Sequence, residues 1–200
     1  MSHQTTIIDL IRHGEPEGGP RFRGSQDDPL STLGWQQMRA AIRGEDHWDV
    51  IVTSPLLRCV EFATEVATQR HLPLHVEDRL REVNFGAWEG KTTAEVIAEE
   101  GEKLSRFWED PVANTPPGAE TITEFNQRVV EGWQHWRDTL AGQRALVVCH
   151  GGVIRMILAD VMGIPLQKSF AGVAVPFACR SRIRVDQSDF GILTSLHSHG

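Results

Sequence analysis

Short apolar segments that alternate with helical segments constrain the fold of this chain most strongly. Three segments are β-branched and nearly all apolar, as in strands buried on both faces: residues 5–12, 50–53 and 145–149. Amphipathic or capped segments between and after them predict helices: residues 33–42, 55–70, 122–140 and 153–162. Strands that alternate with helices predict a three-layer α/β/α sandwich with a mainly parallel central sheet.

Helix starts are marked by capping residues. Ser31 or Thr32 can cap the first helix, and Thr121 begins a capping box with a glutamate three residues later. Ser54 precedes Pro55, which predicts a hydroxyl cap followed by a proline at the first helical position. Three of the four predicted helices therefore begin at a local signal.

Two further segments complete a single predicted domain over residues 1–200. Residues 179–185 and 191–196 are expected to form two closing strands, an antiparallel pair. Residues 91–118 do not fit the strand–helix alternation, and their helical patches and Pro-rich end indicate a helical insertion. That insertion is either a lid over the site or a packing element. The chain of 200 residues is long enough for one compact domain.

Composition excludes several classes of protein. The net charge of -7 argues against a nucleic-acid binder, because phosphate backbones are met with surplus Lys and Arg. No apolar run approaches the ~20 residues of a membrane span, and no secretory signal is recognisable. Cys59, Cys149 and Cys179 contain no C-x-x-C pair, so neither a disulfide framework nor a zinc knuckle is expected. The expected location is the cytoplasm.

Polar residues follow the three buried strands at the points where the strands end. His13 and His150 each come directly after a strand and are followed by glycine. Arg12 lies beside His13, and Arg58 falls in the first turn of the helix after the strand at 50–53. Binding sites of parallel α/β sheets lie beyond the carboxyl ends of their strands, and arginines and helix starts favour anions. These residues therefore predict an anion site that contains two histidines.

Seven sequence elements resemble, in order, the signatures of one family. They are RHGE at residues 12–15, RFRG at 21–24, DPLSTLGWQQ at 28–37, TSPLLR at 53–58, LREVNFGAWEG at 80–90, PPGAE at 116–120 and HGG at 150–152. Together they resemble the histidine phosphatase superfamily, which includes the cofactor-dependent phosphoglycerate mutases. The resemblance covers nearly the whole chain and implies a phosphoglycerate mutase-like fold.

The resemblance also implies a role for each matching residue. His13 would attack phosphorus and form a phosphohistidine that water then hydrolyses. Arg12, Arg58 and His150 would bind the phosphoryl oxygens. Glu82 would be the general acid and then the base, with Glu89 in the same loop as the competing candidate.

Four residues are expected to bind substrate: Arg21, Gly24, Gly151 and Trp88. A loop salt bridge is the alternative for Arg21. Neither a metal nor a cofactor is implied. His197 and His199 share one strand face and could suggest a ligand pair, but a frayed polar tail is the preferred interpretation. Pro16 departs from the family pattern, which has a hydroxyl residue there.

The resemblance favours a phosphatase over a mutase, because FGAWEG replaces the mutase element and little room remains for additional segments. The expected partner is a small-molecule phosphate ester, and the motifs are most similar to those of α-ribazole-5′-phosphate phosphatases. A broad sugar-phosphate phosphatase, a mutase-type phosphotransferase and a non-enzymatic phosphoryl-binding module remain alternatives. A homodimer remains open, since the sequence does not determine the oligomeric state.

Overall fold

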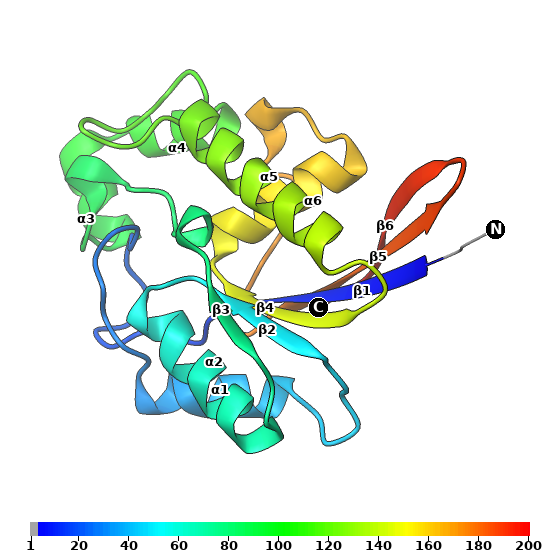
Figure 1. Ribbon diagram of the computed structural model, residues 1–200. Helices are drawn as coiled ribbons and strands as arrows, with labels where there is room; N and C mark the ends of the chain where they lie inside the picture. The colour runs from blue at the N-terminus through cyan, green and yellow to red at the C-terminus, as the bar shows by residue number, and fades with distance from the viewer. Residues whose placement is uncertain (1–3) are drawn as a thin grey trace.

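The computed structural model describes residues 4–200 and is built on one six-stranded sheet (Figure 1). The strands are β1 Gln4–Arg12, β2 Val50–Thr53, β3 Leu74–Val76, β4 Arg144–Cys149, β5 Arg180–Ser188 and β6 Gly191–His199. Their order is β3-β2-β4-β1-β5-β6. The first four in this order are parallel, and β5 pairs antiparallel with both β1 and β6. The predicted mainly parallel sheet and the closing antiparallel pair are confirmed.

Helices cover both faces of this sheet. They are α1 Thr32–Ala41, α2 Leu57–Arg70, α3 Thr93–Glu100, α4 Lys103–Glu109, α5 Ile122–Thr139 and α6 Gly151–Met162. Figure 1 shows α1 and α2 on one face and α5 and α6 on the other. Three short 3₁₀ turns, Asp78–Leu80, Gly86–Trp88 and Leu166–Lys168, lie in the connections. The three-layer sandwich is confirmed, and none of the helices within residues 4–200 has the length and apolarity of a membrane span.

The central strands contribute side chains to two separate cores. In β1, Ile8 and Leu10 pack in the core beneath α5 and α6, whereas Ile11 packs in the core beneath α1 and α2. In β4, Val147 and Val148 divide in the same way. Alternate residues of a strand point to opposite faces, so a strand covered on both faces must be apolar throughout. This is why the buried strands are continuous apolar runs in the sequence.

Two of the predicted helix starts are confirmed and one is wrong. The Ser31 hydroxyl accepts a hydrogen bond from the Gly34 amide, and α5 begins with the predicted capping box. The helix expected from Pro55 instead starts at Leu57, with Leu56 as a cap that makes no side-chain hydrogen bond. Its first amide donates to the Asp27 carboxylate at 2.6 Å. The side chain that caps α2 is therefore Asp27 from a distant loop, and the Ser54 hydroxyl contacts His150.

The C-terminal tail also differs from its prediction. β6 extends to His199, so these residues form the edge strand of the sheet rather than a frayed tail. His199 contacts the Ser181 hydroxyl and the Ala174 carbonyl, each at 2.7 Å. No group of three or more metal-ligating side chains occurs among residues 4–200.

Candidate active site

A cavity of about 240 Å³ lies at the carboxyl ends of β1 and β4. Its floor is formed by Arg12 and His13 after β1 and by the first residues of α6 after β4. The predicted insertion is helical, and α3 and α4 contribute Thr93 and Trp108 to the wall. The other lining residues are Pro16, Pro20, Arg21, Phe22, Arg23, Glu82, Phe85, Gly151, Gly152, Arg155, Phe170 and Phe177.

The ring of His13 is held in one tautomer. Its Nδ1 atom lies 2.7 Å from the carbonyl oxygen of Gly14. A carbonyl can only accept a hydrogen bond, so Nδ1 carries the proton and donates it. The other ring nitrogen, Nε2, consequently keeps its lone pair. His13 is only 5% exposed. Because the hydrogen bond to Gly14 fixes the ring, the Nε2 lone pair has a fixed direction, as a nucleophile requires.

Burial and neighbouring charges keep both histidines neutral. Desolvation, followed by the charges of Arg58 and Arg12, holds the pKa of His13 well below the usual 6.5. The same causes lower the pKa of His150, whose ring packs edge-on against His13 at 5.2 Å between centroids. The His150 Nε2 atom lies 2.7 Å from the Ser54 hydroxyl. Ser54 therefore orients the second histidine, and its hydroxyl also accepts a longer hydrogen bond, at 3.4 Å, from the Leu56 amide directly before α2.

Both histidines are expected to remain neutral when the pH is lowered through 6.5. A folded pKa below the unfolded value means that the unfolded chain binds more protons, so these groups reduce stability as the pH falls below 6.5. Nitrogen chemical shifts of the imidazole rings, followed by NMR from pH 8 to pH 5, measure this directly. Imidazole signals that the wild-type protein shows and the His13→Ala variant lacks are assigned to His13. Protonation of that ring at or above pH 6.5 would contradict the electrostatic argument.

Arg12 and Arg58 each have one buried nitrogen without a protein partner, the Nε atom. Their terminal nitrogens are held by backbone carbonyls: Val175 for Arg12, and Gln26 and Gly24 for Arg58. Burial lowers the pKa of Arg12 to about 10. A buried guanidinium nitrogen that lacks a hydrogen bond is costly. A phosphoryl oxygen in the cavity can satisfy that of Arg12, which lines the cavity, whereas Arg58 is fully buried and lies outside the lining.

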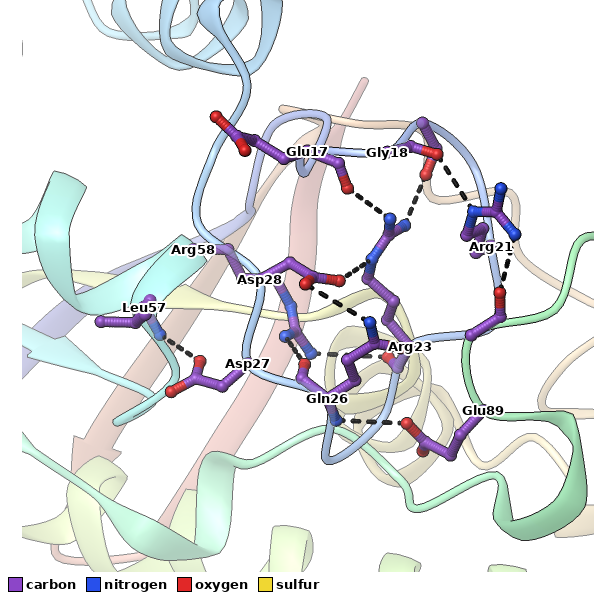
Figure 2. A network of polar contacts seen from close by, with 12 residues as sticks. Glu17, Gly18, Arg21, Arg23, Gln26, Asp27, Asp28, Leu57, Arg58 and Glu89 are labelled. Atoms are coloured by element: carbon purple, nitrogen blue, oxygen red, sulfur yellow. Dashed lines mark hydrogen bonds and ion pairs between the residues drawn. The ribbon is translucent and has the colours of Figure 1, made fainter.

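The two candidate acids have different surroundings. Glu82 lines the cavity and accepts hydrogen bonds from the amides of Gly152 and Val83, at 2.9 and 3.0 Å. Glu89 lies outside the cavity lining and accepts from four loop amides at 2.8–3.1 Å: Gly24, Ser25, Gln26 and Phe85. Figure 2 shows Glu89 beneath this loop. Glu89 thus holds these loop segments together, whereas Glu82 lines the cavity.

The glycines of the strand-end motifs create room for packing. A methyl group on Gly14 would lie 2.3 Å from the Gly34 carbonyl oxygen, where the first motif contacts α1. One on Gly152 would lie 2.2 Å from the Glu82 carboxylate. One on Gly151 would lie 3.2–3.3 Å from guanidinium nitrogens of Arg155 and Arg12. At these positions the absence of a Cβ makes room for protein groups that shape the cavity.

Comparison with known proteins decides the family. The family model described as histidine phosphatase superfamily (branch 1) matches residues 8–195. The chain belongs to this superfamily. Phosphoserine phosphatase 1 of Hydrogenobacter thermophilus is 31% identical over 163 residues, which cover 80% of this chain and 77% of that protein. An adenosylcobalamin/α-ribazole phosphatase of Escherichia coli is 29% identical over 200 residues, 94% of each chain.

A solved structure agrees with this assignment. Mycobacterial glucosyl-3-phosphoglycerate phosphatase in complex with VO3 superimposes with a TM-score of 0.85 at 26% identity, covering 96% of this chain and 97% of that one. Some relatives are much longer proteins. The chain spans 43% of the length of its mycobacterial relatives that are 36% identical, one of which is described as bifunctional.

Two superfamily motif residues lie elsewhere than expected, and a third lines the cavity but is held by its own loop. Trp88 does not line the cavity: it is 1% exposed and packs against Phe22 and Phe107 in the core behind it. Gly24 lies in the loop that Glu89 holds, where a methyl group would overlap the Val83 carbonyl at 1.9 Å. Arg21 lines the cavity, but its guanidinium donates to the carbonyls of Gly18 and Gly90. These contacts indicate loop-stabilising roles, and Figure 2 shows the Arg21 contacts beside the Arg23–Asp28 pair.

Three further arginines were given no role from the sequence, although Arg23 and Arg128 belong to segments that match the superfamily motifs. Arg128 donates to the carbonyls of Arg81 and Glu82 and forms an ion pair with Glu120, so it holds the loop that carries Glu82. Arg23 lines the cavity and pairs with Asp28. Arg155 lines the cavity itself, four residues after Gly151 in α6.

Proposed function

We propose that this protein is a phosphoric monoester hydrolase that works through a phosphohistidine on His13. The observation that carries the proposal is the single tautomer of His13, with Nδ1 donating to Gly14 and Nε2 free beside two arginines. A neutral, fixed imidazole among permanent cations suits attack on an anionic phosphorus.

The reaction proceeds in two displacements. His13 Nε2 forms a bond to phosphorus as the ester P–O bond breaks, and the leaving oxygen takes a proton from the Glu82 carboxyl. Water then attacks the phosphohistidine, its proton passes to the Glu82 carboxylate, and the N–P bond breaks to release phosphate and restore His13. Arg12, Arg58 and His150 stabilise the charge on the transferred group in both steps.

The substrate is a small phosphorylated metabolite that fits the cavity of about 240 Å³. α-Ribazole-5′-phosphate is one candidate, supported by the relative that aligns with 94% of the chain. Phosphoserine and glucosyl-3-phosphoglycerate are candidates on the same kind of evidence, since phosphatases described by these substrates are similar over most of the chain.

Turnover of p-nitrophenyl phosphate is expected to persist after exhaustive dialysis against EDTA, because arginines neutralise the phosphoryl charge in this mechanism. Orthovanadate is expected to inhibit, since it mimics the trigonal-bipyramidal transition state. Steady-state rates with and without each reagent provide the test. Loss of activity that a divalent ion restores would contradict this mechanism, and phosphate binding without any turnover would support the phosphoryl-binding module.

A further inference from the structure

Arg155 is a second cation on the cavity floor that the proposed phosphoryl-transfer chemistry does not use. It lies one helical turn after Gly151 in α6, so its side chain leans back over the start of the helix. A methyl group on Gly151 would be 3.2 Å from its Nη1 atom and 3.3 Å from the Nε atom of Arg12. The two guanidinium groups are therefore neighbours across Gly151.

One segment of backbone holds both arginines in place. Arg155 Nε donates to the carbonyl oxygen of Val173 at 3.1 Å, and Arg12 Nη1 donates to that of Val175 at 2.6 Å. The Arg155 guanidinium also lies over the ring of Phe170, 5.6 Å from its centroid. Phe170 is part of the aromatic wall of the cavity. Arg155 thus stands between the phosphoryl site and the wall that would contact the rest of the substrate.

In the described part of the chain no ion pair holds the guanidinium of Arg155, although Glu82 is close enough to act on its pKa. Of the other cavity arginines, Arg23 is paired with Asp28 and Arg21 lies 3.5 Å from Glu95. Within residues 4–200 no carboxylate forms an ion pair with Arg155, and its two terminal nitrogens donate no hydrogen bond. Glu82 is the single carboxylate of the cavity lining, and backbone amides already hold its oxygens.

Arg155 lies on the side of the cavity where the leaving group would depart. The amide of Gly152 holds the Glu82 carboxylate at 2.9 Å, and Gly151 next to it contacts Arg155, so Arg155 lies near Glu82 as well as beside Arg12. Glu82 is the proposed donor to the leaving oxygen. A group that contacts Arg155 on the side of the Phe170 wall therefore belongs to the leaving alcohol.

We infer that Arg155 binds a second anionic group, a carboxylate or a second phosphate, carried by the leaving alcohol close to the ester oxygen. This inference rests on the proposed phosphatase function and narrows its substrate class. It disfavours α-ribazole-5′-phosphate, whose leaving group has no negative charge. An arginine can bind either anion through two parallel hydrogen bonds, so the geometry supports both.

Matched substrate pairs test this inference through a ratio of kcat/KM values. The carboxylate pairs are 3-phosphoglycerate with glycerol 3-phosphate, and O-phosphoserine with O-phosphoethanolamine. The phosphate pair is glucose 1,6-bisphosphate with glucose 6-phosphate. In the wild-type protein we expect the member with the second anion to be favoured about tenfold or more in at least one kind of pair. A preference within the carboxylate pairs identifies the second anion as a carboxylate, and a preference within the phosphate pair identifies it as a phosphate.

Arg155→Gln is expected to bring that ratio close to one, and Arg155→Lys to restore part of it. The ratio is internal to each variant, so a general loss of activity from disturbed packing would lower both rates and leave it unchanged. Arg39→Gln removes the same charge from an exposed ion pair with Glu65 and is expected to keep the wild-type ratio.

Two outcomes overturn the inference: equal kcat/KM values within every pair in the wild-type protein, or an unchanged ratio in Arg155→Gln. If the wild-type protein hydrolyses both members of every pair equally, only this inference is wrong. If it hydrolyses no phosphate ester, p-nitrophenyl phosphate included, the proposed function itself is wrong.

Discussion

His13→Ala is expected to lower turnover of every phosphate ester to less than about one hundredth of the wild-type rate. The alanine removes the only atom to which the phosphoryl group is proposed to bond. Arg12, Arg58 and His150 remain in place, so the variant is expected to bind phosphate or vanadate still. Steady-state kinetics and calorimetric titration with orthovanadate measure the two properties separately.

His197→Ala is the matched control for this experiment. His197 is exposed on β6, outside the cavity lining, and its loss is expected to leave turnover at the wild-type level. Activity of His13→Ala above one hundredth of wild type would contradict covalent catalysis on this residue. Simultaneous loss of vanadate binding would show that the variant had lost the pocket, and His13→Asn would then serve as the second test.

Glu82→Gln is expected to slow hydrolysis of an alkyl phosphate by roughly 10²-fold or more. The amide keeps the shape of the side chain and can accept from only one of the two backbone amides that contact Glu82, and it cannot protonate a departing alkoxide. p-Nitrophenolate is a stable leaving group that needs little protonation, so the phosphorylation step with p-nitrophenyl phosphate is expected to fall much less. Dephosphorylation is also expected to slow, because the same carboxylate activates water, and a rapid-quench burst of p-nitrophenol would reveal this.

Glu89→Gln tests whether Glu89, rather than Glu82, is the general acid. Its carboxylate accepts four backbone hydrogen bonds, and an amide cannot accept all of them, so we expect a less stable loop and a loss that is equal for both substrates. The quantity to compare is the ratio of alkyl to aryl phosphate turnover in each variant. If this ratio falls in Glu89→Gln and not in Glu82→Gln, the acid is Glu89.

The fold was predictable because its signals are local and repeated. Each central strand is covered on both faces and therefore reads as a continuous apolar run. The start of α2 was not predictable in this way, because its first amide is capped by Asp27, thirty residues earlier in the chain. β3 was missed because it has three residues and its burial pattern is mostly exposed. Such features depend on tertiary contacts rather than on local pattern.

The site was predictable where residues end strands and less so where they fill loops. His13 and His150 meet because β1 and β4 are neighbouring parallel strands. Trp88 was expected at the cavity, yet the cluster of Phe22 and Phe107 buries it, and nothing in the motif distinguishes a lining residue from one directly behind it. The position of Arg155 in the cavity could not be predicted, because it depends on the start of α6 at Gly151, whereas the predicted helix began at residue 153.

The most direct test of the account is identification of the phosphorylated residue. Glu82→Gln is mixed with p-nitrophenyl phosphate, quenched in alkali within the burst, and analysed by peptide mass spectrometry, because phosphohistidine survives alkali and is lost in acid. We expect about one phosphoryl group per chain, located on His13, with no label in His13→Ala. A burst of p-nitrophenol without a labelled peptide, or a label on any other residue, would contradict the phosphohistidine mechanism.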